Sequence, residues 1–270
     1  MAEASHAKPP SYAKDAAVLA SMGVDDALVR RAAAPLGAIA LYQQARLAEP
    51  GRSSIVAEAL HADLFGKTRT IVAGSKSTEE GVSEQLVRSI LQLIGSVVRL
   101  QTFPRMFRVY PWRGAISRAN HFLSSYYLLC HECYILEERL KIFVSSAEAY
   151  AKMRGIDWDS KSVARRILRD HKILFGHFLK VRGSHVHVGD VEPKELDRLS
   201  LIETLIELGE EPAYRLMYSG AIRDARRECV RASLTAVAGG YKLLAALFHV
   251  TRRVWEDVGR TAHPDSPASP

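Results

Sequence analysis

The sequence predicts an all-α fold for this chain of 270 residues. Glycine and proline together account for only 28 residues, too few for a fold of many short strands. Apolar residues recur at helical spacings of three and four, and no segment alternates convincingly between apolar and polar residues. Alanine, leucine, arginine and glutamate, which favour helices, are abundant. These observations favour a helical bundle.

The two ends of the chain and its first hundred residues show the weakest patterns. Residues 1–13 and 259–270 are polar and contain proline, so we expect both to be disordered tails. Residues 14–114 are expected to form a helical N-terminal region of unknown role. Its beginning is rich in alanine and helix-prone, with breaks at Gly23 and Pro35.

Residues 115–258 are predicted to form a bundle of four helices. The first spans 115–154, a stretch without glycine or proline. It carries one apolar stripe at alternating spacings of four and three. The residues of this stripe are Phe122, Tyr126, Leu129, Cys133, Leu136, Leu140 and Phe143.

The second helix is predicted from about Ser160 to Arg182. Asp159 or Ser160 is a plausible N-cap, and Gly183 is expected to end the helix. Extending the apolar face in steps of three and four places His171 and Arg182 on the inward side.

Two further helices complete the predicted bundle. The third begins with Pro193 in its first turn and stops at Gly209. The fourth occupies roughly 219–258 and has Gly239 and Gly240 at its middle, where helices approach closely or kink.

The segment KVRGSHVHVGD, residues 180–190, follows the second helix. Arg182 and His187 form an Arg-x4-His pattern, and a break at Gly183 would fold His187 back beside Arg182. A permanent cation and a histidine titrating near neutrality are the groups that hold a phosphodiester and move protons around it, with no metal required. In the alternative, Arg182 and Lys180 interact with the negative end of the helix dipole.

An all-α chain with a long first core helix, a second core helix ending in Arg-x4-His and two further helices resembles the HEPN superfamily (higher eukaryotes and prokaryotes nucleotide-binding domains). Many members are metal-independent endoribonucleases that dimerise, so that two motifs share a cleft. The resemblance implies that Arg182 stabilises the phosphate and that His187 acts as general acid or base in transfer to the RNA 2′-hydroxyl. The family usually has Asn, Asp or His where this chain has Gly183.

The leading hypothesis is therefore a metal-independent endoribonuclease or RNA-processing protein. His185 is expected to assist Arg182 if the helix continues, and Ser184 to hydrogen-bond a phosphate oxygen. We expect RNA or a nucleotide as ligand, no cofactor, a homodimer, and an antitoxin or other protein as a further partner. The alternative is a non-catalytic HEPN-like module that binds nucleotide, RNA or protein. A DNA-associated helical protein is a third hypothesis, for which no helix-turn-helix is recognisable.

A second candidate surface is RLQTFPRMFRVYPWRGAISR, residues 99–118. It holds five arginines interleaved with aromatic residues and no acid. Arg105, Arg108, Arg113 and Trp112 are candidates for contact with RNA phosphates and bases. In the alternative, the aromatic side chains fill the bundle while the arginines pair with surface acids.

Cysteine content and charge indicate the compartment and the class of partner. Only three cysteines occur, which favours a reducing environment. The CHEC segment at 130–133 lies within a predicted helix, so core cysteines are expected rather than a zinc site. The net charge of +7 favours polyanionic partners. Without a signal-peptide pattern or an apolar run of about 20 residues, we expect a soluble, cytoplasmic protein that makes no membrane contact.

Overall fold

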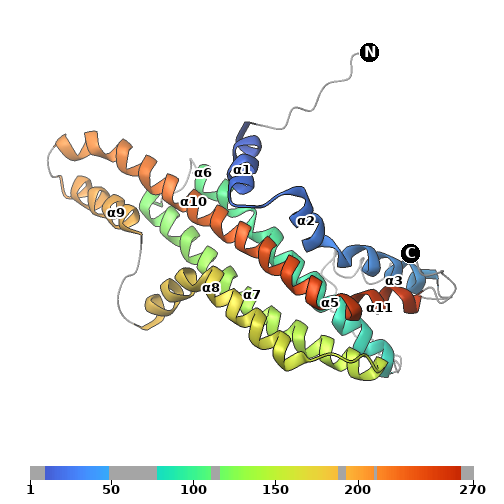
Figure 1. The fold of residues 1–270 in the computed structure, drawn as a ribbon. Coiled ribbons are helices and arrows are strands. Elements are labelled where there is room, and N and C mark those ends of the chain that lie inside the picture. The colour runs from blue at the N-terminus through green and yellow to red at the C-terminus, as the bar shows by residue number, and fades with distance from the viewer. Residues whose placement is uncertain (1–9, 49–77, 111–115, 188–192, 210–211, 263–270) are drawn as a thin grey trace, which may run out of the picture.

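A computed structural model confirms the all-α fold. The residues that it describes are 10–48, 78–110, 116–187, 193–209 and 212–262. Every regular element within these ranges is an α-helix (Figure 1).

The described residues form ten helices, labelled as in Figure 1. Those before residue 116 are α1 (Pro10–Ser21), α2 (Asp26–Ala33), α3 (Pro35–Ala48), α5 (Thr78–Leu100) and α6 (Phe103–Arg108). Those after it are α7 (Arg118–Arg154), α8 (Ser160–His187), α9 (Lys194–Glu207), α10 (Pro212–Val250) and α11 (Arg252–Ala262).

Both ends of the chain are more helical than the sequence predicts. α1 begins at Pro10, inside the predicted tail 1–13, and α11 reaches Ala262, inside the predicted tail 259–270. Proline suits the first turn of a helix, because the N–H that it lacks has no partner there. In α11, a Cβ on the buried Gly259 would lie 3.1 Å from a side-chain carbon of α3, so close packing holds this helix in place.

α7 and α10 lie at the centre of the bundle. α5 and α8 pack along α7, while α10 contacts α2, α5, α6, α8 and α9 (Figure 1). The buried core runs from Ala32 in α2 to Val258 in α11. The described parts of the N-terminal region 14–114 therefore pack into the same core as those of residues 115–258.

α7 has the face that the sequence predicts. All seven residues of the apolar stripe are buried. Ser117 caps the helix by accepting a hydrogen bond from the Asn120 N–H at 3.2 Å, and Gly155 ends it with a φ of 65°. The observed bounds therefore agree closely with the predicted 115–154.

α9 anchors the start of α7 through Glu203, whose side chain is buried. The Glu203 carboxylate accepts hydrogen bonds from the backbone N–H groups of Arg118 and Ala119, both at 3.1 Å, and from the Tyr218 hydroxyl at 2.8 Å. A carboxylate at a helix N-terminus interacts favourably with the helix dipole. One charged side chain thus ties together α7, α9 and α10.

The fourth predicted helix is divided in the structure. α10 ends at Val250 and α11 begins at Arg252, so the predicted helix over 219–258 is interrupted at Thr251. The Thr251 hydroxyl donates to the carbonyl of Leu247 at 2.9 Å, which satisfies one of the last carbonyls of α10.

Neighbouring helices approach α10 closely at its two central glycines, as the sequence predicts. A Cβ on Gly239 would lie 3.2 Å from the Phe175 ring of α8, and one on Gly240 would lie 2.9 Å from a Val97 methyl of α5. α10 continues through both positions, so the glycines permit contact rather than a break.

α10 is also the one helix in the described ranges that is long and apolar enough to cross a membrane. An 18-residue window within it has a mean hydropathy of 1.3, and 67% of that window is buried inside the bundle. Its contacts with the other helices at the centre of the fold bury much of this apolar surface.

The cysteines are core residues, as expected. Cys130, Cys133 and Cys229 are free and fully buried. Burial raises the pKa of the Cys130 thiol to about 12 and shifts the pKa of the other two thiols in the same direction. All three therefore remain protonated thiols at neutral pH.

Candidate functional site

α8 carries the Arg-x4-His motif and differs from its prediction at one end. Its start is as predicted, because the Asp159 carboxylate accepts a hydrogen bond from the Ser162 N–H at 3.0 Å. The predicted end at Gly183 is wrong, since the helix continues to His187. Gly183 is not among the described glycines of positive φ, and Val181, two residues earlier, is buried against the core. Nothing at Gly183 forces the chain to turn.

The continuous helix separates the residues that the motif was expected to bring together. Arg182 and His187 are five residues apart and therefore about 140° apart around the axis. Arg182 and His185 are only about 60° apart, on the side toward the core. Ser184 and His187 have angular positions on the outward side. The side chains of residues 184–187 lie outside the described part of the structure.

Arg182 lies at the edge of the core, against α7. Its guanidinium carbon is 3.9 Å from the centroid of the Tyr134 ring, a cation–π contact. The side chain is half-buried, and no carboxylate of the described residues forms an ion pair with it. Stacking leaves the N–H donors of a guanidinium at its rim, where an anion can accept them.

α8 crosses α7 near this point. On one flank of α8, the Nε2 atom of His177 lies 3.0 Å from the hydroxyl of the buried Tyr126. On the other flank, Arg182 covers Tyr134. Burial raises the pKa of Tyr126 well above its usual range, so this phenol keeps its proton and serves as a structural hydrogen-bond partner.

His171 faces inward, as predicted, and is fully buried. Its Nε2 atom donates to the Cys133 carbonyl at 3.1 Å, and its ring stacks on Phe175 with a centroid separation of 4.8 Å. Nδ1 lies 4.0 Å from the Glu137 carboxylate. Burial lowers the pKa of His171, so the ring is neutral at pH 7.

His171 should make stability depend on pH. Because its pKa is lower in the folded state than the ordinary 6.5, the unfolded chain binds more protons as the pH falls. Its stabilising contribution is therefore complete above about pH 6.5 and is lost below it, by at most about 1.4 kcal/mol per pH unit. Urea unfolding between pH 7.5 and 5 should show a steeper loss for the native chain than for His171→Gln. Parallel curves would contradict the prediction.

Several side chains of the arginine and aromatic segment 99–118 make contacts within the bundle. Phe103 and Phe107 are buried, and Arg108 forms a two-pronged ion pair with Asp15 of α1. Arg99 bonds to Glu132 of α7 at 3.0 Å. Phe103, Phe107, Arg99 and Arg108 thus have the contacts that the structural alternative expects.

The other candidates for RNA contact in that segment are Arg105, Arg113 and Trp112. Arg105 is exposed. Arg113 and Trp112 lie outside the described residues. Of the four candidates proposed for RNA contact, Arg105 is therefore the one whose side chain the structure describes as exposed to solvent.

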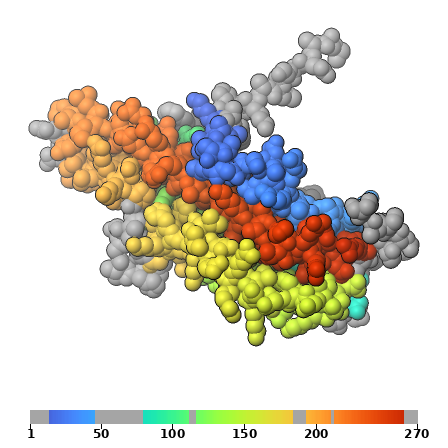
Figure 2. All heavy atoms as spheres, in the orientation of Figure 1, coloured from blue at the N-terminus to red at the C-terminus, as the bar shows by residue number. Residues whose placement is uncertain are grey.

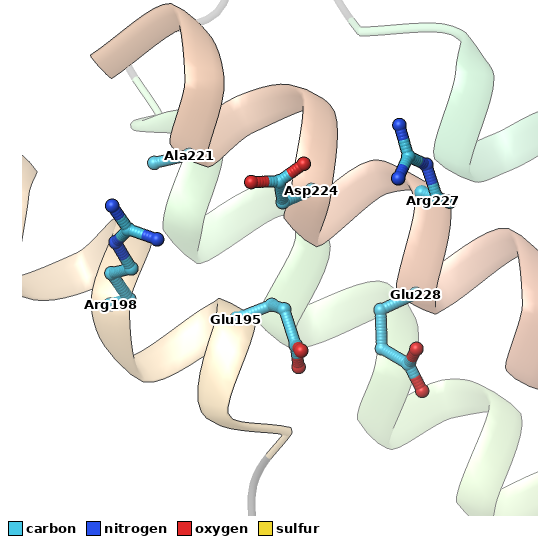
Figure 3. Close-up of a pocket in the computed structure, with 6 residues that line it drawn as sticks. All are labelled: Glu195, Arg198, Ala221, Asp224, Arg227 and Glu228. Atoms are coloured by element: carbon cyan, nitrogen blue, oxygen red, sulfur yellow. The ribbon is translucent and has the colours of Figure 1, made fainter. Parts of the chain in front are cut away.

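A hollow of about 350 Å³ lies between α9 and α10, away from the predicted residues. Figure 3 shows Glu195 and Arg198 of α9 on one side and Asp224, Arg227 and Glu228 of α10 on the other. Its acids and bases are mixed, and Glu228 is already held by Arg231 at 2.7 and 2.9 Å. Within the described residues, no three His, Cys, Asp or Glu side chains are arranged to hold a metal ion.

Comparisons with protein-family models, with curated proteins and with solved structures give no match to this chain. Arguments about its function therefore rest on its own residues.

Five exposed cations of α8 were not among the candidates from the motif analysis. They are Lys161, Arg165, Arg166, Arg169 and Lys172. The charge of each predicted helix, counted separately, is the sequence signal that would have drawn attention to them.

Proposed function

We propose that this chain binds RNA or a nucleotide through α8 and does not cleave it within a single copy. The observation that carries the proposal is the unbroken course of α8 through Gly183, since it separates Arg182 from His187. A phosphate held by Arg182 then has no general acid or base supplied by His187 of the same chain. This agrees with the HEPN resemblance, which also covers proteins that bind nucleotide or RNA without cleaving it.

A homodimer that cleaves RNA is the second candidate function. A second copy can bring its own His187 beside Arg182 without breaking α8. The outer side of α7 favours such a contact, because Leu128 is 52% exposed and Ile142 is 47% exposed there. In this candidate the two motifs share one cleft and act without a metal.

Binding and cleavage are separated by incubating an unstructured, fluorescent RNA oligonucleotide with the purified chain in EDTA. We expect fluorescence anisotropy to show binding and gels to show intact RNA. Arg182→Ala should weaken binding about tenfold, because a charge-assisted hydrogen bond is lost. Arg253→Ala, an exposed arginine on α11, is the matched control and should bind normally. An oligonucleotide that does not bind at low salt would refute the proposal.

Cleavage in EDTA that both Arg182→Ala and His187→Ala abolish would establish the second candidate instead. Its dimer is tested by oxidative cross-linking of Ser184→Cys. The three native cysteines can stay in place because they are buried. A chain that remains monomeric and never cross-links would exclude the composite site.

A further inference from the structure

The positive charge of this protein is concentrated in one helix. α8 contains seven lysine and arginine residues and one acid, a formal charge of +6. The whole chain of 270 residues has a net charge of +7. The other 242 residues together are therefore almost neutral, with a formal charge of +1.

Most of this charge faces solvent. The exposed cations of α8 are Lys161, Arg165, Arg166, Arg169, Lys172 and Lys180. Figure 2 shows α8, in yellow, along the surface of the molecule. Helix geometry places residues 161, 165, 169 and 172 within about 80° of one another, in a row roughly 17 Å long. The acid of α8, Asp170, lies at the edge of this face, 3.9 Å from Arg169.

Several surface cations of the other helices have acidic partners about one turn away. On α7, Lys141 bonds to Glu137 and Glu138, and Lys152 bonds to Glu148. On α10 and α11, the same pattern joins Arg231 to Glu228, and Arg252 and Arg260 to Glu256.

α8 repeats like charges at this spacing, at residues 161, 165 and 169. α10 has a similar run at residues 223, 227 and 231, but there Glu228 forms an ion pair with Arg231. Like charges four residues apart repel and destabilise a helix. A bound polyanion would offset this repulsion, because each of these cations would then lie close to a negative charge.

We infer that the outward face of α8, from Lys161 to Lys180, binds the phosphate backbone of single-stranded RNA; this inference rests on the proposed function and specifies its surface. A lipid surface fits less well. The apolar side of α8 is buried in the bundle, with Ile167 and Phe175 fully covered, so the helix has no apolar face to insert. Ile173, 73% exposed, is the one large apolar side chain of α8 found exposed among its described side chains.

The outward face of α8 also continues to His187 of the Arg-x4-His motif. His187 follows Arg169 by 18 residues, which is five turns of 3.6, so the two share one angular position on α8. Among the described side chains of α8, no phenylalanine, tyrosine or tryptophan is exposed for stacking on bases. Recognition along it therefore depends on phosphates and is independent of sequence.

The test is the salt dependence of binding, measured by anisotropy with an unstructured RNA oligonucleotide at several KCl concentrations. Affinity falls with salt with a log–log slope of about −0.7 for each phosphate neutralised on a single strand. The double substitution Arg165→Ala and Arg169→Ala removes two phosphate contacts. It should therefore make the slope less negative by about 1.4. Lys161→Ala with Lys172→Ala, a second pair on the same face, should have a similar effect.

Arg252→Ala with Arg253→Ala is the control, since it removes the same charge from a different helix, α11 (Figure 1). If all pairs change the slope equally, net charge alone attracts the RNA and the inference is overturned. If the native chain binds RNA but the double substitutions on α8 leave the slope unchanged, the inference is overturned and the proposed function is not. A native chain that binds no RNA overturns both.

Binding to a lipid surface is tested with vesicles of equal parts phosphatidylserine and phosphatidylcholine. If they bind the native chain more tightly than RNA does, and the α8 pairs abolish this binding, the face recognises anionic lipid and the inference is wrong.

Discussion

Replacing Phe107 with alanine is expected to lower the free energy of unfolding by about 3–5 kcal/mol. The Phe107 side chain is fully buried in the common core and lies between Phe103 and Phe122, with ring centroids 6.5 Å from each. Its truncation removes apolar contacts and leaves a cavity where α6 meets α7 and α10. Urea unfolding of the purified variant measures the loss.

Arg105→Ala is the matched control for this prediction, because Arg105 lies on α6 but faces solvent. A surface substitution of this kind changes stability by no more than about 0.5 kcal/mol. If Phe107→Ala is as stable as Arg105→Ala, the aromatic residues of segment 99–118 do not fill the bundle. That outcome would revive their assignment to base stacking.

Gly240→Val is expected to cost about 3 kcal/mol of stability, at the upper end of the range for overpacking. A Cβ alone would lie 2.9 and 3.2 Å from the two methyl groups of Val97, and the branched side chain adds two more carbons. α10 and α5 must then move apart along a core in which Leu100 is also fully buried. Thermal or urea unfolding provides the measurement.

Gly176→Val separates this clash from the effect of valine in a helix. Gly176 lies within α8, and a Cβ there would meet nothing within 4 Å. Valine has a better helix propensity than glycine, so stability should be unchanged or slightly higher. Equal losses for the two variants would show that close packing at Gly240 is not the cause.

The sequence predicts the helices best where a single face decides their position. The stripe of α7 repeats the helical period over six turns, and its seven residues are all buried. Asp159 as the N-cap of α8 and the close approach at Gly239 and Gly240 follow in the same way from residue type and spacing. Information of this kind lies within a short window of sequence, so it can be derived without knowing what packs nearby.

The course of α8 at Gly183 is different. Glycine is compatible with a helix interior and with a left-handed cap, so its presence does not select between them. The neighbouring Val181 is buried and Arg182 stacks on Tyr134. These contacts with the rest of the bundle favour the helical conformation, and they separate Arg182 from His187.

By itself, the sequence determined the all-α class, the buried face of α7 and the presence of a basic motif near the end of α8. Only the tertiary structure decided which charges are available to a partner. Arg108 meets an acid 93 positions away in the chain, whereas Arg165, Arg166 and Lys172 on α8 are exposed to solvent. Helical periodicity is a local property of the chain, while the neutralisation of a charge depends on which distant side chains packing brings within reach.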